Sequence, residues 1–216
     1  MSLTEQDHMN IAARARALEA RTGTQVVAAV VGKSDSYPEA PWKAFALGTT
    51  FAALVCVLVQ LAAHDWPADI PGAGPVLGGL VFGALLALLT VVHAPFARLF
   101  VDRIRCDVEV MQYAQSLFFR RGLDRVRSRV GILLLISLFE RKVVILADAG
   151  FNARVQAHDW AALTDRIAFL LRNRTPTIAL QAGLEALEAL MLERGYSESA
   201  TASASADAPL FTTDEP

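Results

Sequence analysis

The chain has 216 residues, of which 54% are hydrophobic and 19% are charged, and its formal net charge at pH 7 is −2. Soluble proteins carry about 25% charged residues, so the composition is shifted toward that of membrane proteins. The balanced charge argues against a nucleic-acid-binding protein, and two cysteines are too few for a disulfide framework.

The first expected element is a helix that starts at Thr4 and ends at Thr22 and Gly23. Charged residues recur through residues 1–24, so we expect no secretory signal there. The run 24–32 is short, β-branched and apolar on both faces, which predicts a strand in a sheet covered on both sides. Its partner strands must therefore lie elsewhere in the chain.

Two uncharged stretches, about 44–63 and 72–94, are each long enough to cross a bilayer as a helix. The short connector between them is acidic and broken by proline, so we expect a transmembrane hairpin over residues 43–97. A pair of buried helices in a soluble core is the alternative.

Basic residues flank both spans and are absent from the connector, which carries Trp66 as an expected interfacial aromatic. The positive-inside rule then places both termini in the cytoplasm, as in a multi-pass protein of a bacterial-type inner membrane, with the lipid bilayer as a partner. The residues expected at the membrane interface are Trp66, Arg98, Arg103 and Arg105.

Gly79 and Gly83 have the small-xxx-small spacing that lets helices approach closely. Packing against the first span of the same hairpin is one interpretation, and homodimer formation through these glycines is the other.

After the hairpin we expect a helix over about 102–121, a buried strand over 130–138, a polar turn, and a third strand over 143–148. Two helices with apolar stripes follow. The tail from 196 to 216 is rich in Ser, Ala and Thr, and we expect it to be disordered. Residues 1–42 and 98–195 would thus form one α/β domain that the hairpin interrupts.

Two segments together resemble the TPM domain family: TGTQVVAAVVGKSDSYPEAPW at the first strand, and VGILLLISLFERKVVILADAGF at the strand pair. The arrangement is similar to a membrane-anchored bacterial subfamily with a transmembrane hairpin after the first strand. The resemblance implies a three-layer α/β domain, a small sheet flanked by helices. It also implies either a role as an accessory factor for membrane complexes or a phosphatase activity.

Parallel pairing of the first two strands would bring Asp35, Glu140, Arg141 and Lys142 to one edge of the sheet. The opposite edge would hold Thr22, Arg129, Asp148 and Asn152. Our ligand or metal candidates are Asp35, Glu140, Arg141, Asp148 and Asn152.

A divalent cation, Mg²⁺ or Ca²⁺, is the cofactor that such carboxylates would bind. For each candidate, a turn, a helix end or a surface ion pair is the alternative role.

No Walker A, Rossmann or nucleophile-elbow pattern occurs, so covalent catalysis is not expected and no catalytic residue is assigned. We therefore expect a membrane-anchored accessory domain that binds or helps assemble a partner membrane protein. A metal-assisted phosphatase or other hydrolase is the alternative.

Overall fold

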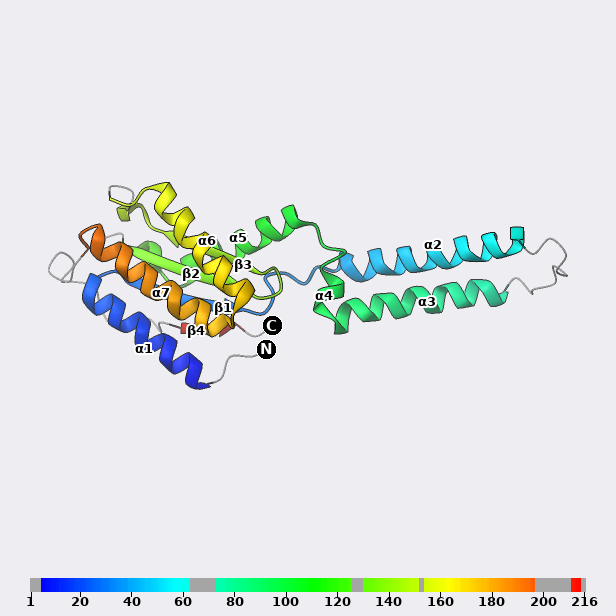
Figure 1. Ribbon diagram of the computed structural model, residues 1–216, viewed down its shortest axis with the longest axis horizontal. Helices are drawn as coiled ribbons and strands as arrows, with labels where there is room; N and C mark the ends of the chain where they lie inside the picture. The colour runs from blue at the N-terminus through cyan, green and yellow to red at the C-terminus, as the bar shows by residue number, and fades with distance from the viewer. Residues whose placement is uncertain (1–4, 63–72, 126–129, 152–153, 197–210, 215–216) are drawn as a thin grey trace. The chain divides into compact units, whose positions relative to one another are not determined.

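The computed structural model describes residues 5–62, 73–125, 130–151, 154–196 and 211–214, the last four by their backbone (Figure 1). The chain divides into two compact units. One consists of Met1–Asp35 with Asp107–Pro216, and the other of Ser36–Cys106.

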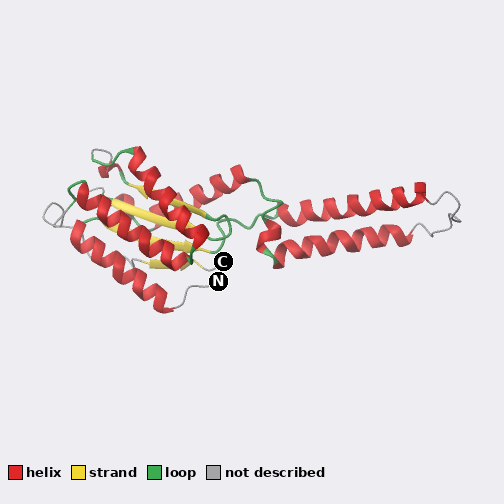
Figure 2. Cartoon of the chain, viewed as in Figure 1, coloured by secondary structure: helices red, strands yellow, loops and turns green. Residues whose placement is uncertain are grey.

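The unit Ser36–Cys106 is a helical hairpin. Helix α2 (Glu39–Ala62) and helix α3 (Ala73–Val92) pack side by side, and the short helix α4 (Ala94–Ala97) follows α3 (Figure 2). Both long helices are apolar enough to cross a membrane, and only 11% and 17% of their most apolar 18-residue stretches are buried. A core helix of a soluble protein would be mostly buried, so the uncovered apolar surface favours a membrane-embedded hairpin.

The other unit is built on a four-stranded sheet in the order β3-β2-β1-β4. Its strands are β1 (Gln25–Val31), β2 (Gly131–Ser137), β3 (Lys142–Ala147) and β4 (Phe211–Asp214). Strand β1 pairs in parallel with β2, with Val27 opposite Leu133, and β2 pairs antiparallel with β3. The expected pairing of strands on either side of the hairpin is thereby confirmed.

Helices cover both faces of this sheet and make the three layers expected from the sequence. Helices α1 (Glu5–Thr22), α6 (Ala157–Asn173) and α7 (Pro176–Glu193) lie on one face. Helix α5 (Arg103–Arg120) packs on the other face, and the 3-10 helices Leu123–Arg125 and Ala149–Phe151 lie before β2 and after β3.

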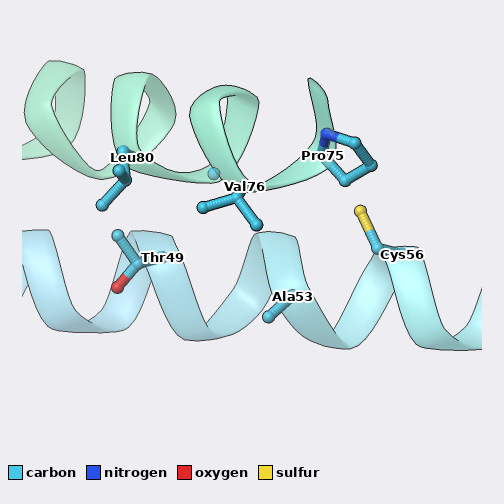
Figure 3. A pocket seen from close by; sticks show the side chains of 7 residues that line it. Thr49, Ala53, Cys56, Pro75, Val76 and Leu80 are labelled. Atoms are coloured by element: carbon cyan, nitrogen blue, oxygen red, sulfur yellow. The ribbon is translucent and has the colours of Figure 1, made fainter. Parts of the chain in front are cut away.

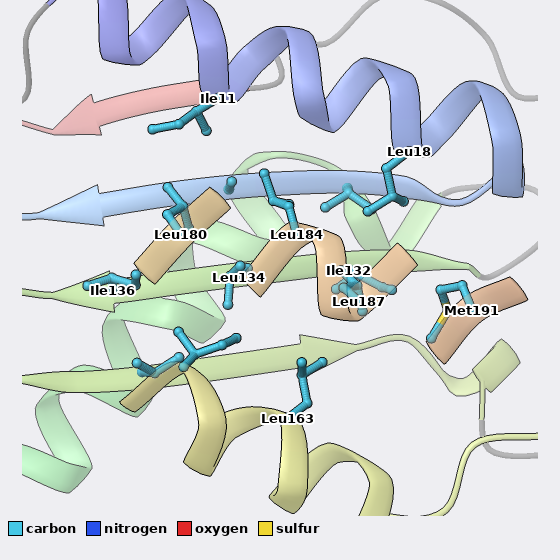
Figure 4. Packing of buried hydrophobic residues seen from close by; sticks show 14 of the residues in the cluster. Ile11, Leu18, Ile132, Leu134, Ile136, Leu163, Leu180, Leu184, Leu187 and Met191 are labelled. Atoms are coloured by element: carbon cyan, nitrogen blue, oxygen red, sulfur yellow. The ribbon is translucent and has the colours of Figure 1, made fainter. Parts of the chain in front are cut away.

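Strand β1 shows why the sheet needs both layers. Successive side chains of a strand point to opposite faces. Val26, Ala28 and Val30 therefore enter the cluster under α1, α6 and α7, whereas Val27 and Ala29 enter the cluster under α5. Figure 4 shows the first cluster, in which β2 residues such as Leu134 lie beneath leucines of α7.

The structure differs from the expectation of a wholly disordered tail at two places. Tyr196 is buried, its ring lies 5.0 Å from that of Phe151, and its hydroxyl donates to the carbonyl oxygen of Gly150 at 3.2 Å. Residues Phe211–Asp214 form β4, parallel to β1. Both corrections have the same cause: the tail is polar on average, and this average hides the few residues that are suited to packing or strand pairing. Residues 197–210 lie outside the described residues.

Candidate functional site

The carboxyl ends of β1 and β2 meet at one edge of the sheet because the two strands are parallel. Backbone pairing continues past both strand ends, with Leu138 N–H donating to Val31 O at 3.0 Å and Phe139 N–H to Gly32 O at 2.9 Å. In open α/β sheets, ligands commonly bind at this carboxyl edge.

Three polar residues form a connected cluster at this edge, which we call the edge cluster: Ser34, Ser137 and Glu140. The backbone N–H of Ser34 donates to Glu140 Oε1 at 3.0 Å, and the Ser34 hydroxyl donates to Ser137 Oγ at 3.1 Å. The Ser137 hydroxyl donates to the other carboxylate oxygen of Glu140. One carboxylate thus holds the segment that follows β1 against the end of β2.

The sequence-predicted residues at this edge take different positions. Glu140 belongs to the edge cluster, and Asp35 is half-buried and follows Ser34 directly. Arg141 is exposed in the β2–β3 turn with a φ of 53°, a left-handed conformation that is uncommon for arginine. Lys142 forms an ion pair with Asp107 of α5.

Sequence reasoning missed the two serines. Ser137 lies at the end of an apolar run and has no Gly-x-Ser-x-Gly context, so its local sequence does not mark it. Its partners, Ser34 and Glu140, lie 103 residues before it and three residues after it. The available signal was the polar segment directly after β1, which parallel pairing brings to the end of β2.

The opposite edge of the sheet carries Asp148, which is buried. Its Oδ1 accepts from the backbone N–H of Ala149 at 2.7 Å, and its own N–H donates to Gly131 O at 2.9 Å. Thr22 Oγ1 lies 2.6 Å from Thr24 Oγ1 at the end of α1. Arg129 and Asn152 lie outside the described residues, so their expected place at this edge stays a prediction.

The expected Mg²⁺ or Ca²⁺ site is not evident in this arrangement. Among the described residues, no group of three or more His, Cys, Asp or Glu side chains gathers in a metal-binding arrangement. Glu140 and Asp148 follow opposite ends of the β2–β3 pair, so they do not share one site.

Helix α5 exposes an apolar flank in the part that belongs to the sheet-containing unit. Val108, Met111 and Phe119 are 40–63% exposed. At 100° per residue they fall within about 80° of one another around the helix. Val110, Ala114 and Leu117 face the sheet instead. We call the exposed set the α5 flank.

Two glycines determine how closely the hairpin helices pack. A Cβ atom on Gly83 would lie 2.6 Å from Thr49 Cγ2 and 2.8 Å from Phe45 O, and one on Gly48 would lie 2.9 Å from Gly83 Cα. Gly79 faces Ala52 across the same interface. Packing within one hairpin thus occupies Gly79 and Gly83, and the homodimer through them stays a prediction.

A pocket of about 310 Å³ opens further along the hairpin, between α2 and α3 (Figure 3). Its lining is almost wholly apolar and includes Ala53, Cys56, Pro75 and Val76. A polar substrate would find few hydrogen-bond partners there, so the pocket is better suited to a hydrocarbon chain than to a catalytic site.

The features above define a class: a small α/β domain whose β1-to-β2 crossover contains an apolar helical hairpin. Residues 93–190 match the family model of the TPM domain, and the chain therefore carries a TPM domain. Strands β1 and β4 lie outside the matched residues, and β1 joins the sheet by parallel pairing with β2.

A solved structure shares this fold: the NMR structure of the BA42 protein from the psychrophilic bacterium Bizionia argentinensis. The TM-score is 0.57 and the sequence identity 12%, over 99% of this chain and 96% of that chain. At this identity the similarity establishes the fold alone. No curated protein matches the chain.

Proposed function

We propose that the protein is a membrane-anchored TPM domain that binds a partner membrane protein and supports its assembly. Helices α2 and α3 cross the membrane as a hairpin, and both termini lie in the cytoplasm of a bacterial-type cell. The distribution of basic residues supports this orientation, because Lys33, Lys43 and Arg98 flank the spans whereas the connector 64–71 has no Lys or Arg.

The α5 flank is the observation that carries the binding proposal. Large apolar side chains spaced along one flank of a helix are the usual form of a helix-recognition surface. Methionine is common on such surfaces because its flexible thioether adapts to a partner. We therefore expect the partner to present an apolar helix or groove next to its own membrane span.

Phe119 and Phe169 offer a matched experiment. Both are exposed phenylalanines, at 63% and 61%, but Phe119 lies on the α5 flank and Phe169 on α6. A photo-crosslinking amino acid at Met111 in the full chain would identify the partner in native membranes. Phe119→Ser should then reduce recovery of that crosslinked partner severalfold, and Phe169→Ser should leave it unchanged.

Two outcomes would contradict the proposal. Crosslinking from Met111 to lipid alone would refute the proposal that a protein partner binds here. Equal losses of the crosslinked partner from Phe119→Ser and Phe169→Ser would refute the proposal that the α5 flank is the binding surface. Circular dichroism of both variants would show that the comparison is made between folded proteins.

A metal-assisted phosphatase is the alternative, and the edge cluster is the observation that favours it. Its hydroxyl and carboxylate oxygens, with Asp35 beside them in the chain, are the ligand types that hard cations prefer. Phosphomonoester hydrolysis by the purified chain with Mg²⁺, Ca²⁺ or chelator tests it. Turnover lost in Glu140→Gln would support this alternative, and no turnover above a mock preparation would reject it.

A further inference from the structure

We propose that the base of the hairpin is a binding surface for anionic phospholipid headgroups, formed by the residues that surround the first turns of α2. This surface, the basal collar, consists of Trp42, Lys43, Arg98, Leu99, Arg103 and Ile104. The inference rests on the proposed membrane anchoring and goes beyond it, because it names which residues contact the lipid surface and which lipids they prefer.

Two contacts hold the two parts of the collar, the start of α2 and the segment after α4, at the same position along the hairpin. The Lys43 ammonium on α2 donates to the backbone carbonyl of Phe100 at 3.0 Å, and Arg105 Nη1 lies 3.2 Å from Glu39 Oε1 at the start of α2. The segment that follows α4 is therefore held beside the first turns of α2. Since an α-helix rises about 1.5 Å per residue, Trp42 and Lys43 lie only about one turn above Glu39.

The collar exposes large apolar side chains next to the hairpin. Trp42, Leu99 and Ile104 are 72–76% exposed, as much as the most exposed residues of the spans themselves. Tryptophan is enriched at membrane interfaces because its ring is apolar and its indole N–H is polar. These three side chains are suited to the boundary between headgroups and acyl chains.

Basic residues alternate with these apolar ones. The unit's described residues include Lys43, Arg98, Arg103 and Arg105, all at the base, against the acidic Glu39 and Asp102. Glu39 is paired with Arg105, and Asp102 Oδ1 accepts from Ile104 N–H at 2.9 Å. The base therefore has a net positive charge, which complements the negative surface of a cytoplasmic leaflet.

Charge complementarity and continuity with the two apolar helices both select lipid as the occupant. A long basic side chain at this level extends its charge to the phosphate groups while its methylene stem contacts acyl chains. Replacing one of these basic residues should weaken the preference of the collar for anionic over zwitterionic lipid about fivefold.

Trp42 fluorescence tests the position of the collar. The full chain with Trp66→Phe and Trp160→Phe retains Trp42 as its one tryptophan. In vesicles of phosphatidylglycerol and phosphatidylcholine, we expect quenching by lipids brominated near the headgroup to exceed quenching by lipids brominated near the chain end. Quenching of Trp42 only by aqueous iodide would overturn the proposal.

A charge series tests the lipid preference. The anionic vesicles should raise the midpoint of thermal unfolding relative to pure phosphatidylcholine vesicles. The difference should disappear in the triple variant Lys43→Gln, Arg98→Gln, Arg103→Gln and persist in the control Arg172→Gln, an exposed arginine of α6. Equal differences in both variants would overturn the lipid preference.

Alkaline extraction of the native membranes separates this failure from failure of the anchoring. A chain released at alkaline pH would refute the membrane-spanning hairpin and the collar with it. A chain that stays in the membrane but shows no shallow quenching of Trp42 would refute the collar alone.

Discussion

The close approach of α2 and α3 at Gly83 leads to a sharp prediction about the hairpin. Gly83→Ala adds one methyl group, and its carbon would lie 2.6 Å from Thr49 Cγ2 and 2.8 Å from the carbonyl oxygen of Phe45. Carbon atoms in favourable contact are about 3.5–4.0 Å apart. The two helices must therefore separate by roughly 1 Å, because the Phe45 oxygen belongs to the backbone and cannot rotate away.

Overpacking of this kind costs about 1–3 kcal/mol. That range lowers the population of the closely packed hairpin by a factor of about 5 to 150, since each 1.4 kcal/mol is tenfold. Gly78 provides the control, because a Cβ atom there has no heavy atom within 4 Å. Gly78→Ala makes the same chemical change in the same helix, so it also matches the gain in helix propensity.

A disulfide between α2 and α3 gives the assay. A Cβ atom on Gly79 would lie 3.6 Å from Ala52 Cβ, which is within the range for a disulfide. Ala52→Cys with Gly79→Cys, in a chain whose Cys56 and Cys106 are replaced by serine, should oxidise readily within one chain. The extent of disulfide formation is measured by coupling the remaining free thiols to a maleimide-bearing polymer and counting them.

We expect Gly83→Ala to slow this oxidation at least severalfold and Gly78→Ala to leave its rate unchanged. Equal rates in both variants would refute the argued packing at Gly83. A disulfide that formed only between chains, seen as a dimer on a non-reducing gel, would instead support the homodimer alternative.

Two further predictions concern the sheet-containing unit. Asp159 accepts from the backbone N–H of Gln156 at 2.9 Å and from Arg194 at 2.7 Å, and these interactions lower the pKa of its carboxyl. At pH values above about 3.9, the ordinary pKa of such a carboxyl, its ionised form stabilises the folded state. This stabilisation is lost as the pH falls through the lower pKa that the carboxyl has in the folded state. Asp159→Asn should therefore lower the thermal midpoint at pH 7, with the difference shrinking toward pH 3 in circular dichroism melts; a constant difference would contradict this. Leu134→Ala, in the fully buried centre of β2, should cost about 2–5 kcal/mol in urea unfolding, whereas Leu192→Ala on the exposed side of α7 should cost far less.

The sheet could be predicted from the sequence because its strands carry an unusual pattern. Runs such as 24–32 and 130–138 are apolar on both faces, and such runs are stable only inside a sheet with helices on both sides. The intervening helix near 102–121 supplied the crossover that parallel pairing needs. The exact register, with Val27 opposite Leu133, comes from the structure alone, because runs that are apolar on both faces carry no alternation to fix it.

The contacts of the edge cluster could not be predicted, because they depend on residues that the sequence separates by about a hundred positions. Ser137 has no local feature that marks it, and its environment exists only after β1 and β2 pair. Trp42 was missed for a similar reason. The position of the first turn of α2 beside the segment that follows α4 is set by the Lys43 contact to the Phe100 carbonyl, which no periodicity reveals.

The position of the hairpin in the chain follows from the topology of the sheet. Parallel strands require a long connection from the carboxyl end of one to the amino end of the next. Here the connection between β1 and β2 leaves the sheet near Ser34 and includes α5. Lengthening such a connection costs little free energy, because the entropy cost of closing a loop grows only with the logarithm of its length. The hairpin lies at the start of this crossover, outside the paired residues of β1 and β2.

The edge cluster acts where the insertion begins. Glu140 and Ser137 hold Ser34, which lies between the end of β1 and the start of α2. The two hydrogen bonds tie the segment after β1 to the end of β2, which is one of the two inner strands of the described sheet. An edge that resembles a ligand site in other α/β folds therefore has a structural reason to be polar in this one, because its side chains join the segment that leaves β1 to the end of β2.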